Sequence, residues 1–93
     1  MLPMDEQVEE TTIQVLVLTN KLILISEIQE VLADIGQPDC RLINPHLILD
    51  DQEMVPWMSE YTDKTEIMLS SDKILTLVEP KGKLLDNYLK LIK

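Results

Sequence analysis

The chain has few aromatic, histidine and cysteine side chains. Its 93 residues include no phenylalanine, one tryptophan, two tyrosines, one histidine and one cysteine. A core with so few rings has to be aliphatic, and the branched aliphatic residues that predominate here favour β-strands. A single cysteine excludes an internal disulfide, which is typical of proteins from a reducing compartment. One cysteine and one histidine are also too few for a closed zinc site within one chain.

Basic residues are equally scarce. The net charge is −9, and the first 78 residues hold 15 carboxylates but only four basic groups. Such a charge repels phosphate backbones at long range, so any contact with nucleic acid has to be local or repeated around an assembly. No apolar stretch approaches the roughly 20 residues that a membrane helix needs. Residues 1–6 also lack the basic and apolar regions of a signal peptide. We therefore expect a cytoplasmic protein without membrane association.

Catalytic and cofactor-binding patterns are missing. The only two glycines, Gly36 and Gly82, exclude a glycine-rich phosphate loop. His46 follows a proline within a strand pattern and is expected to be structural rather than a general base. Cys40 has no basic neighbour in sequence and is expected to be a small buried hydrophobe. These features predict a protein that is not an enzyme and binds no cofactor.

One carboxylate cluster lies outside the N-terminal segment, at Asp50, Asp51 and Glu53. A calcium loop needs more ligands at regular spacing and a glycine at its turn. We expect this cluster to be a solvated loop, and the sequence predicts no metal site.

Length and charge divide the chain into two parts. Ninety-three residues suit a single domain. Residues 1–12 are acidic and are interpreted as either a short helix or a frayed tail, and residues 13–93 are interpreted as the domain. Two β-rich runs, Ile13–Leu18 and Leu22–Val31, flank Asn20, which tolerates the left-handed backbone of a tight turn. This pattern predicts an antiparallel hairpin.

A third strand is predicted over Cys40–Asp50. Its alternation places His46 on the same face as Cys40 and Leu42, and Leu47 on the opposite face. Pro45 lies in its middle and cannot donate to a sheet hydrogen bond, which predicts a bulge, a sharp bend or a free edge there.

The C-terminal third has weaker strand patterns and one helical pattern. Met54–Met58 and Glu66–Leu69 are candidate strands, and Lys73–Val78 is a further strand. Apolar residues then recur at helical spacing and predict an amphipathic helix over residues 81–92; they are Leu84, Leu85, Tyr88, Leu89 and Ile92. The fold class is therefore mainly β, a small, strongly bent barrel with a C-terminal helix.

Several segments carry a resemblance to a known family. They are Leu18-Thr19-Asn20-Lys21, Ile23–Glu27, Cys40-Arg41-Leu42-Ile43-Asn44-Pro45, Trp57-Met58-Ser59 and Ser70–Pro80. Together they make nearly all of residues 13–92 similar to small Sm-like proteins encoded by cyanophages and abundant in marine metagenomic collections. This resemblance implies a five-stranded Sm-like (SH3-like) barrel that forms homo-oligomeric rings, pentamers among them, in the phage-infected host cell. In Sm and Hfq proteins such rings bind RNA.

The resemblance also implies where nucleic acid would be held. Ser71, Asp72 and Lys73 occupy the loop where Sm proteins carry an Arg-Gly or Lys-Gly pair. The segment Gly36–Asp39, which includes Gln37, lies where Sm proteins place an Asp and Asn pair. In a ring, one lysine per subunit becomes a circle of positive charge around the pore. Lys73, Arg41 and Lys21 are the candidate cations, with ordinary surface charge as the alternative for each.

Two functions from different classes remain open. The first is a ring that binds single-stranded RNA or DNA through loops facing its pore, with a role in RNA or DNA processing in the phage or its host. The alternative is an acidic interaction scaffold, or nucleic-acid mimic, that binds a host protein. The positions of Lys73, Arg41 and Lys21 distinguish them, because convergence at a pore favours the first function and scatter favours the second.

Overall fold

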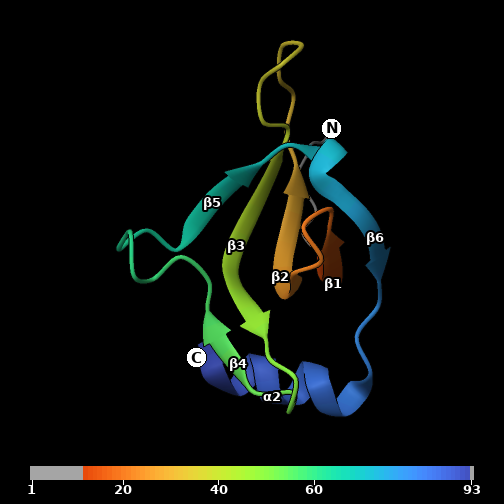
Figure 1. Cartoon of the computed structure of the whole chain (residues 1–93), viewed down its shortest axis with the longest axis vertical. Helices are drawn as coiled ribbons and strands as arrows, with labels where there is room; N and C mark the ends of the chain where they lie inside the picture. Colours follow the sequence, from red (N-terminus) through yellow and green to blue (C-terminus); the bar gives the residue numbers. More distant parts are fainter. Residues whose placement is uncertain (1–11, 93) are drawn as a thin grey trace, which may run out of the picture.

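The computed structural model describes residues 12–92 as one antiparallel sheet and one C-terminal helix (Figure 1). The strands are β1 (Thr12–Leu18), β2 (Ile23–Glu30), β3 (Cys40–Ile48), β4 (Met54–Pro56), β5 (Glu66–Leu69) and β6 (Ile74–Val78). A single 3-10 turn, η1 (Ser71–Lys73), precedes β6, and the helix is α2 (Gly82–Ile92). The mainly β fold with a C-terminal helix is confirmed, although the sheet has six strands rather than five. Thr12 belongs to β1, while the helix or tail expected before it lies outside the described residues.

The predicted hairpin is formed by β1 and β2, which pair from Thr12 with Ile28 to Val17 with Ile23. Its turn differs in detail from the prediction, because the left-handed residue is Lys21, with φ of 71°, and not Asn20. Asn20 acts instead through its side chain, whose Oδ1 accepts a hydrogen bond from the Leu22 N–H at 3.2 Å. Such side-chain turns are common for asparagine.

Strand β3 organises the sheet because three strands pair with it. β2 runs along one edge of β3, while β4 pairs with its C-terminal end and β5 with its N-terminal end on the other edge. At the other side of the sheet, β6 pairs with β1. The order is therefore β4–β3–β2–β1–β6, with β5 beside β3.

The bend predicted at Pro45 is present in β3. Asn44 has a φ of 54°, and the register with β2 shifts at this point. Backbone groups freed by the bend find partners in the 57–65 connection between β4 and β5. The Asn44 N–H donates to Thr65 O at 2.7 Å, and Pro45 O accepts from the Trp57 N–H at 2.9 Å. The bend therefore leaves these buried polar groups satisfied.

The bend reverses the alternation of side chains along β3. Cys40 and Leu42 belong to the core, as predicted, but beyond the bend Leu47 packs against the core. His46 instead meets the ring of Tyr88, with centroids 5.5 Å apart. The predicted placement of His46 and Leu47 is therefore wrong, because a bulge shifts the two-residue period by one position.

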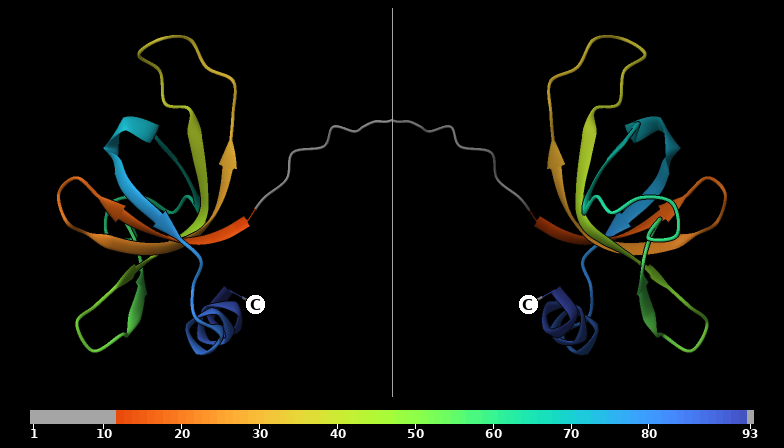
Figure 2. Two further views of the ribbon diagram at one scale, coloured as in Figure 1. Left: turned by 90° about the vertical axis from the view of Figure 1, so that its right-hand side faces the viewer. Right: turned by 90° about the vertical axis from the view of Figure 1, so that its left-hand side faces the viewer.

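The helix docks on the sheet of its own chain. The five residues of the predicted apolar stripe are its buried or half-buried positions, and Tyr88 is completely buried. Figures 1 and 2 show α2 at one end of the molecule, with the 31–39 loop between β2 and β3 projecting at the other. Within residues 12–92, no helix is long and apolar enough to cross a membrane.

Candidate functional site

Two connections that are far apart in sequence meet at Asp39 and Ser71. Asp39 ends the 31–39 loop, and Ser71 begins η1 between β5 and β6. The Asp39 carboxylate accepts hydrogen bonds from both the backbone N–H and the hydroxyl of Ser71, each at 2.7 Å. These hydrogen bonds, first from the hydroxyl and then from the backbone, lower the pKa of Asp39 below its ordinary value. The two loops implicated by the Sm resemblance are thus joined within one chain.

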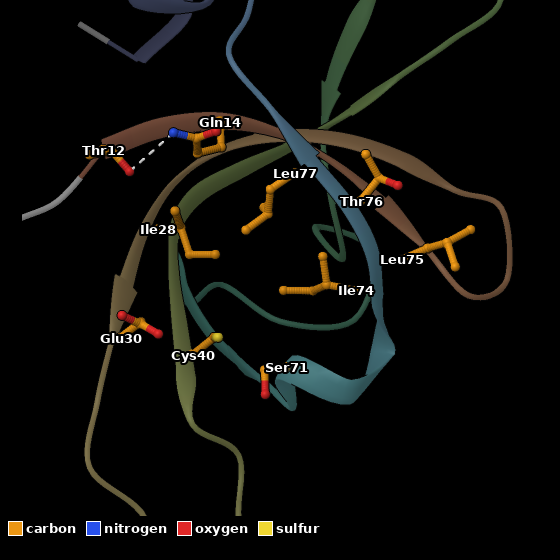
Figure 3. Close-up of a pocket in the computed structure, with 10 residues that line it drawn as sticks. All are labelled: Thr12, Gln14, Ile28, Glu30, Cys40, Ser71, Ile74, Leu75, Thr76 and Leu77. Atoms are coloured by element: carbon orange, nitrogen blue, oxygen red, sulfur yellow. Dashed lines mark hydrogen bonds between the residues drawn. The ribbon is translucent and has the colours of Figure 1, made fainter.

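A cavity of about 830 Å³ opens beside this junction (Figure 3). Ile28, Ile74 and Leu77 project into it, while Glu30, Cys40 and Ser71 lie along one side of its mouth. Cys40 is buried, and its pKa is raised mainly by burial and further by the charges of Asp39 and Glu30. A buried thiol that is kept protonated is a poor nucleophile. The cavity is therefore suited to binding an apolar group and not to thiol chemistry.

The three candidate cations do not converge on one spot within the chain. Lys73 is exposed on η1, and its carbonyl oxygen accepts a hydrogen bond from the Thr19 N–H at 2.9 Å, which holds η1 beside the β1–β2 turn. Lys21 lies in that turn and lines a separate groove with Asp50 and Asp51.

Arg41 is already engaged by neighbouring side chains. Its guanidinium donates to Gln29 Oε1 at 2.7 Å and lies 3.7 Å from the Glu66 carboxylate. Because Cys40 and Leu42 on either side of it enter the core, Arg41 lies on the opposite face of β3 from the cavity. Lys73 is therefore the one predicted cation at the junction of the two loops.

The remaining predicted residues surround the same junction. Asp72 is exposed on η1 next to Ser71. Gln37 is exposed in the 31–39 loop, where its N–H donates to Asp34 O at 3.0 Å and closes a turn. Ser71, Asp72, Lys73 and Gln37 thus belong to two adjoining loops, whereas Arg41 and Lys21 belong to other surfaces.

Three exposed apolar residues were not anticipated as functional residues. Leu32 and Ile35 are fully exposed in the 31–39 loop, at 104% relative accessibility each. Tyr61 is 77% exposed, while Trp57 packs against the core. Hydrophobicity alone places such residues inside. Their exposure depends on loop geometry, for which the sequence carries only the general turn signal of Asp34, Gly36 and Pro38.

Strand β6 is an unprotected edge. It pairs with β1 on one side and with no described strand on the other. Its sequence Ile-Leu-Thr-Leu-Val contains no charge, and Leu75, Leu77 and Val78 are 68%, 48% and 47% exposed. Exposed, uncharged edge strands favour pairing with another chain.

The sequence was compared with known protein families. Residues 11–93 match the model of a family of unknown function, DUF6561. The chain belongs to this family. No curated protein matches the sequence. The DUF6561 match covers almost the whole chain, and the description of the family names no activity.

The geometry of this DUF6561 member offers little for catalysis. His46 is buried, with Nδ1 3.0 Å from Asn44 O and its ring against Tyr88. In the part of the chain that the structure describes, no three His, Cys, Asp or Glu side chains come together as metal ligands do. The junction of Asp39 and Ser71, with Lys73 beside it, remains the best-defined polar site.

Proposed function

We propose that this protein is an Sm-like module that assembles into a homo-oligomeric ring and holds single-stranded RNA or DNA against the joined loops. Its role would then be in RNA or DNA processing. The observation that carries the proposal is the pair of 2.7 Å hydrogen bonds between Asp39 and Ser71. These bonds unite the two loops that the resemblance assigns to nucleic acid.

The strand order supports an Sm-like barrel. Because β4 and β5 occupy two parts of the same edge of β3, they can be counted as one strand interrupted by residues 57–65. The sheet then has five positions, with β6 at one edge and the β4–β5 position at the other. Pairing of β6 with β5 of the next copy joins two different surfaces. A contact of that kind generates a ring when the rotation closes.

The charge of the loops supports contact with nucleic acid only in an assembly. Lys73 is one cation beside Asp39 and Asp72, so a single chain has little attraction for phosphate. A ring would repeat Lys73 in every subunit around one axis, which concentrates positive charge locally. Because the Ser71 hydroxyl and N–H already donate to Asp39, the contact with phosphate would come from Lys73.

The alternative function, an acidic scaffold or nucleic-acid mimic that binds a host protein, is supported by a separate observation. Arg41 is paired with Glu66, and Lys21 shares its groove with Asp50 and Asp51. Outside η1, these two basic side chains therefore lie beside carboxylates, and the surface around them is acidic. Such a surface would attract a basic site on another protein.

Fluorescence anisotropy of labelled oligo-U, oligo-A and single-stranded DNA tests the proposal at about 50 mM and 200 mM salt. Light scattering on the same sample measures the subunit number. We expect binding that weakens steeply with salt, because phosphate contacts release counterions. Lys73→Ala should weaken binding to all three probes. Lys64→Ala, which removes an exposed lysine from the 57–65 connection, is the matched control.

Two outcomes would reject nucleic-acid binding at the joined loops. One is an intact ring that binds none of the probes at low salt, which would favour the acidic scaffold. The other is equal loss of affinity in Lys73→Ala and Lys64→Ala, which would indicate a general effect of charge and reject the joined loops as the site.

A further inference from the structure

The 31–39 loop presents two aliphatic side chains to solvent on a projecting tip. Leu32 and Ile35 are each exposed at 104%, more than any other large hydrophobic residue among residues 12–92. Scattered single apolar residues are normal on a surface, but neighbouring ones on a projection usually mark a binding site. Figure 2 shows that the loop extends well beyond the sheet, so the other residues of the 12–92 range do not cover it.

The base of this loop is held by hydrogen bonds. The Val31 N–H donates to Asp39 O at 2.9 Å, and the Asp39 carboxylate accepts a hydrogen bond from the N–H of Ser71, in the connection between β5 and β6. Gly36, with φ of 87°, allows the turn that Gln37 closes on Asp34. A tip that is shaped before binding loses less conformational freedom when it docks.

The cavity of about 830 Å³ lies directly beside this loop. Its lining includes Glu30, the last residue of β2, and Cys40, the first residue of β3, which flank the loop. Ile28, Ile74 and Leu77 form its walls (Figure 3). The volume falls in the range of pockets that hold whole small-molecule ligands. It therefore has room for a pair of aliphatic side chains.

We propose that two copies of this chain dock face to face, each inserting Leu32 and Ile35 into the cavity of the other. Projection and cavity occur side by side at the same end of one molecule, which is the arrangement a two-fold, self-complementary interface requires. The contact involves the β6 side chains that line the cavity, Ile74 to Leu77, whereas a ring would use the free backbone edge of β6. In a ring, the contact would stack two rings.

The charges around the contact favour a second copy over a membrane. Residues 31–39 contain Asp34 and Asp39 and no cation, so the tip is repelled by anionic lipid. The exposed Lys73 ends η1, which begins with Ser71 at the mouth of the cavity, and offers a cation to Asp34 of the incoming loop.

Analytical ultracentrifugation of the full chain tests this proposal. We expect the double variant Leu32→Ser with Ile35→Ser to have half the mass of the wild type, because burial of each aliphatic side chain is worth about tenfold or more in affinity. The dimer buries four such side chains and should therefore weaken by about 10,000-fold or more. Leu91→Ser, which removes an exposed leucine from α2, is the matched control and should keep the wild-type mass. Equal masses for wild type and double variant would overturn the proposal.

Cross-linking gives a second readout. In a Cys40→Ala chain, Ile35→Cys combined with Leu77→Cys should form a disulfide-linked dimer under mild oxidation. Ile35→Cys combined with Asp51→Cys should not, because Asp51 lines a different groove. Equal cross-linking of the two pairs would contradict docking in the cavity. Sedimentation with vesicles containing phosphatidylglycerol tests whether the loop binds a membrane instead. If the protein binds these vesicles, and Ile35→Ser abolishes that binding without changing the mass of the protein, the proposal is overturned.

Ring failure and stacking failure remain distinguishable. Val78→Lys changes the one β6 residue that does not line the cavity, and it should reduce the number of subunits in a ring but leave the face-to-face contact. The loop variant should halve the mass whatever the ring size. A protein that never forms rings can therefore still confirm or refute the loop contact.

Discussion

The hydroxyl oxygen of Tyr88 lies 2.8 Å from the carbonyl oxygen of Asn44, so α2 is hydrogen-bonded to the bend of β3. The same hydroxyl lies 3.2 Å from Ile43 O and accepts a hydrogen bond from the Glu27 N–H at 3.3 Å. One side chain of the helix therefore contacts both strands at the point where their register shifts. The helix and the bulge stabilise each other.

Tyr88→Phe should lower the free energy of unfolding by about 1–3 kcal/mol, because the buried backbone groups at the bend lose a hydrogen-bond partner while the ring remains. Urea denaturation followed by circular dichroism measures the change. Tyr61→Phe is the control, since Tyr61 is 77% exposed, and it should leave stability unchanged. Equal stability of the Tyr88→Phe variant and the wild type would mean that these hydrogen bonds contribute nothing net.

The stability should also fall at high pH. Burial raises the pKa of Tyr88 to about 12, against an ordinary value near 10. The unfolded chain loses this proton first, so the contribution of Tyr88 is fully present below about pH 10 and is lost between about pH 10 and 12. In a Tyr61→Phe chain Tyr88 is the only tyrosine. Its ultraviolet titration should then have a midpoint near pH 12, and a midpoint near 10 would contradict the burial.

Ser71→Ala should raise the pKa of Asp39 towards its ordinary value, because the variant loses the hydroxyl hydrogen bond that is the main cause of the lowering. Carboxyl-carbon NMR titration of Asp39 measures this shift. Ser59→Ala removes another exposed hydroxyl, one that donates to Pro56 O, and should leave Asp39 unaffected. In the wild type the link between the loops should hold above the ordinary carboxyl pKa and weaken as the pH falls through the lowered value.

Val78→Lys should break self-association through β6 without unfolding the chain. Val78 is 47% exposed, and a lysine on an edge strand opposes pairing with another strand. Light scattering should show a loss of mass, and circular dichroism should stay the same. Leu91→Lys places the same charge on an exposed position of α2 and is expected to preserve the assembly. If the mass of Val78→Lys matches that of the wild type, β6 is not the assembly edge.

Local signals in the sequence predicted much of the fold. Pro45 indicated the bend in β3, and the apolar spacing from Leu84 to Ile92 defined the buried face of α2. The exchange of faces between His46 and Leu47 was missed because the alternation was counted along one strand as if it contained no bulge. A bulge is detected only when the partner strand is known, as for β2 here.

The candidate site was less accessible to sequence reasoning. Ser71, Asp72 and Lys73 were identified as one loop, yet their link to Asp39 joins residues with no local relationship. Arg41 was expected near the pore, but its partners Gln29 and Glu66 come from two other strands. Such long-range pairings depend on sheet order and register, which composition and periodicity do not encode.

The pairing of Leu18 with Ile74 has a consequence for how the protein is made. The outer edge of β1 is covered by β6, which is synthesised long after β1, and Tyr88 is synthesised after β6. During synthesis the β1–β2–β3 meander can form first, but it leaves the ribosome with that edge unpaired. Completion of the sheet therefore waits for β6, and slow translation of the residues between β3 and β6 would prolong exposure of a surface prone to aggregation.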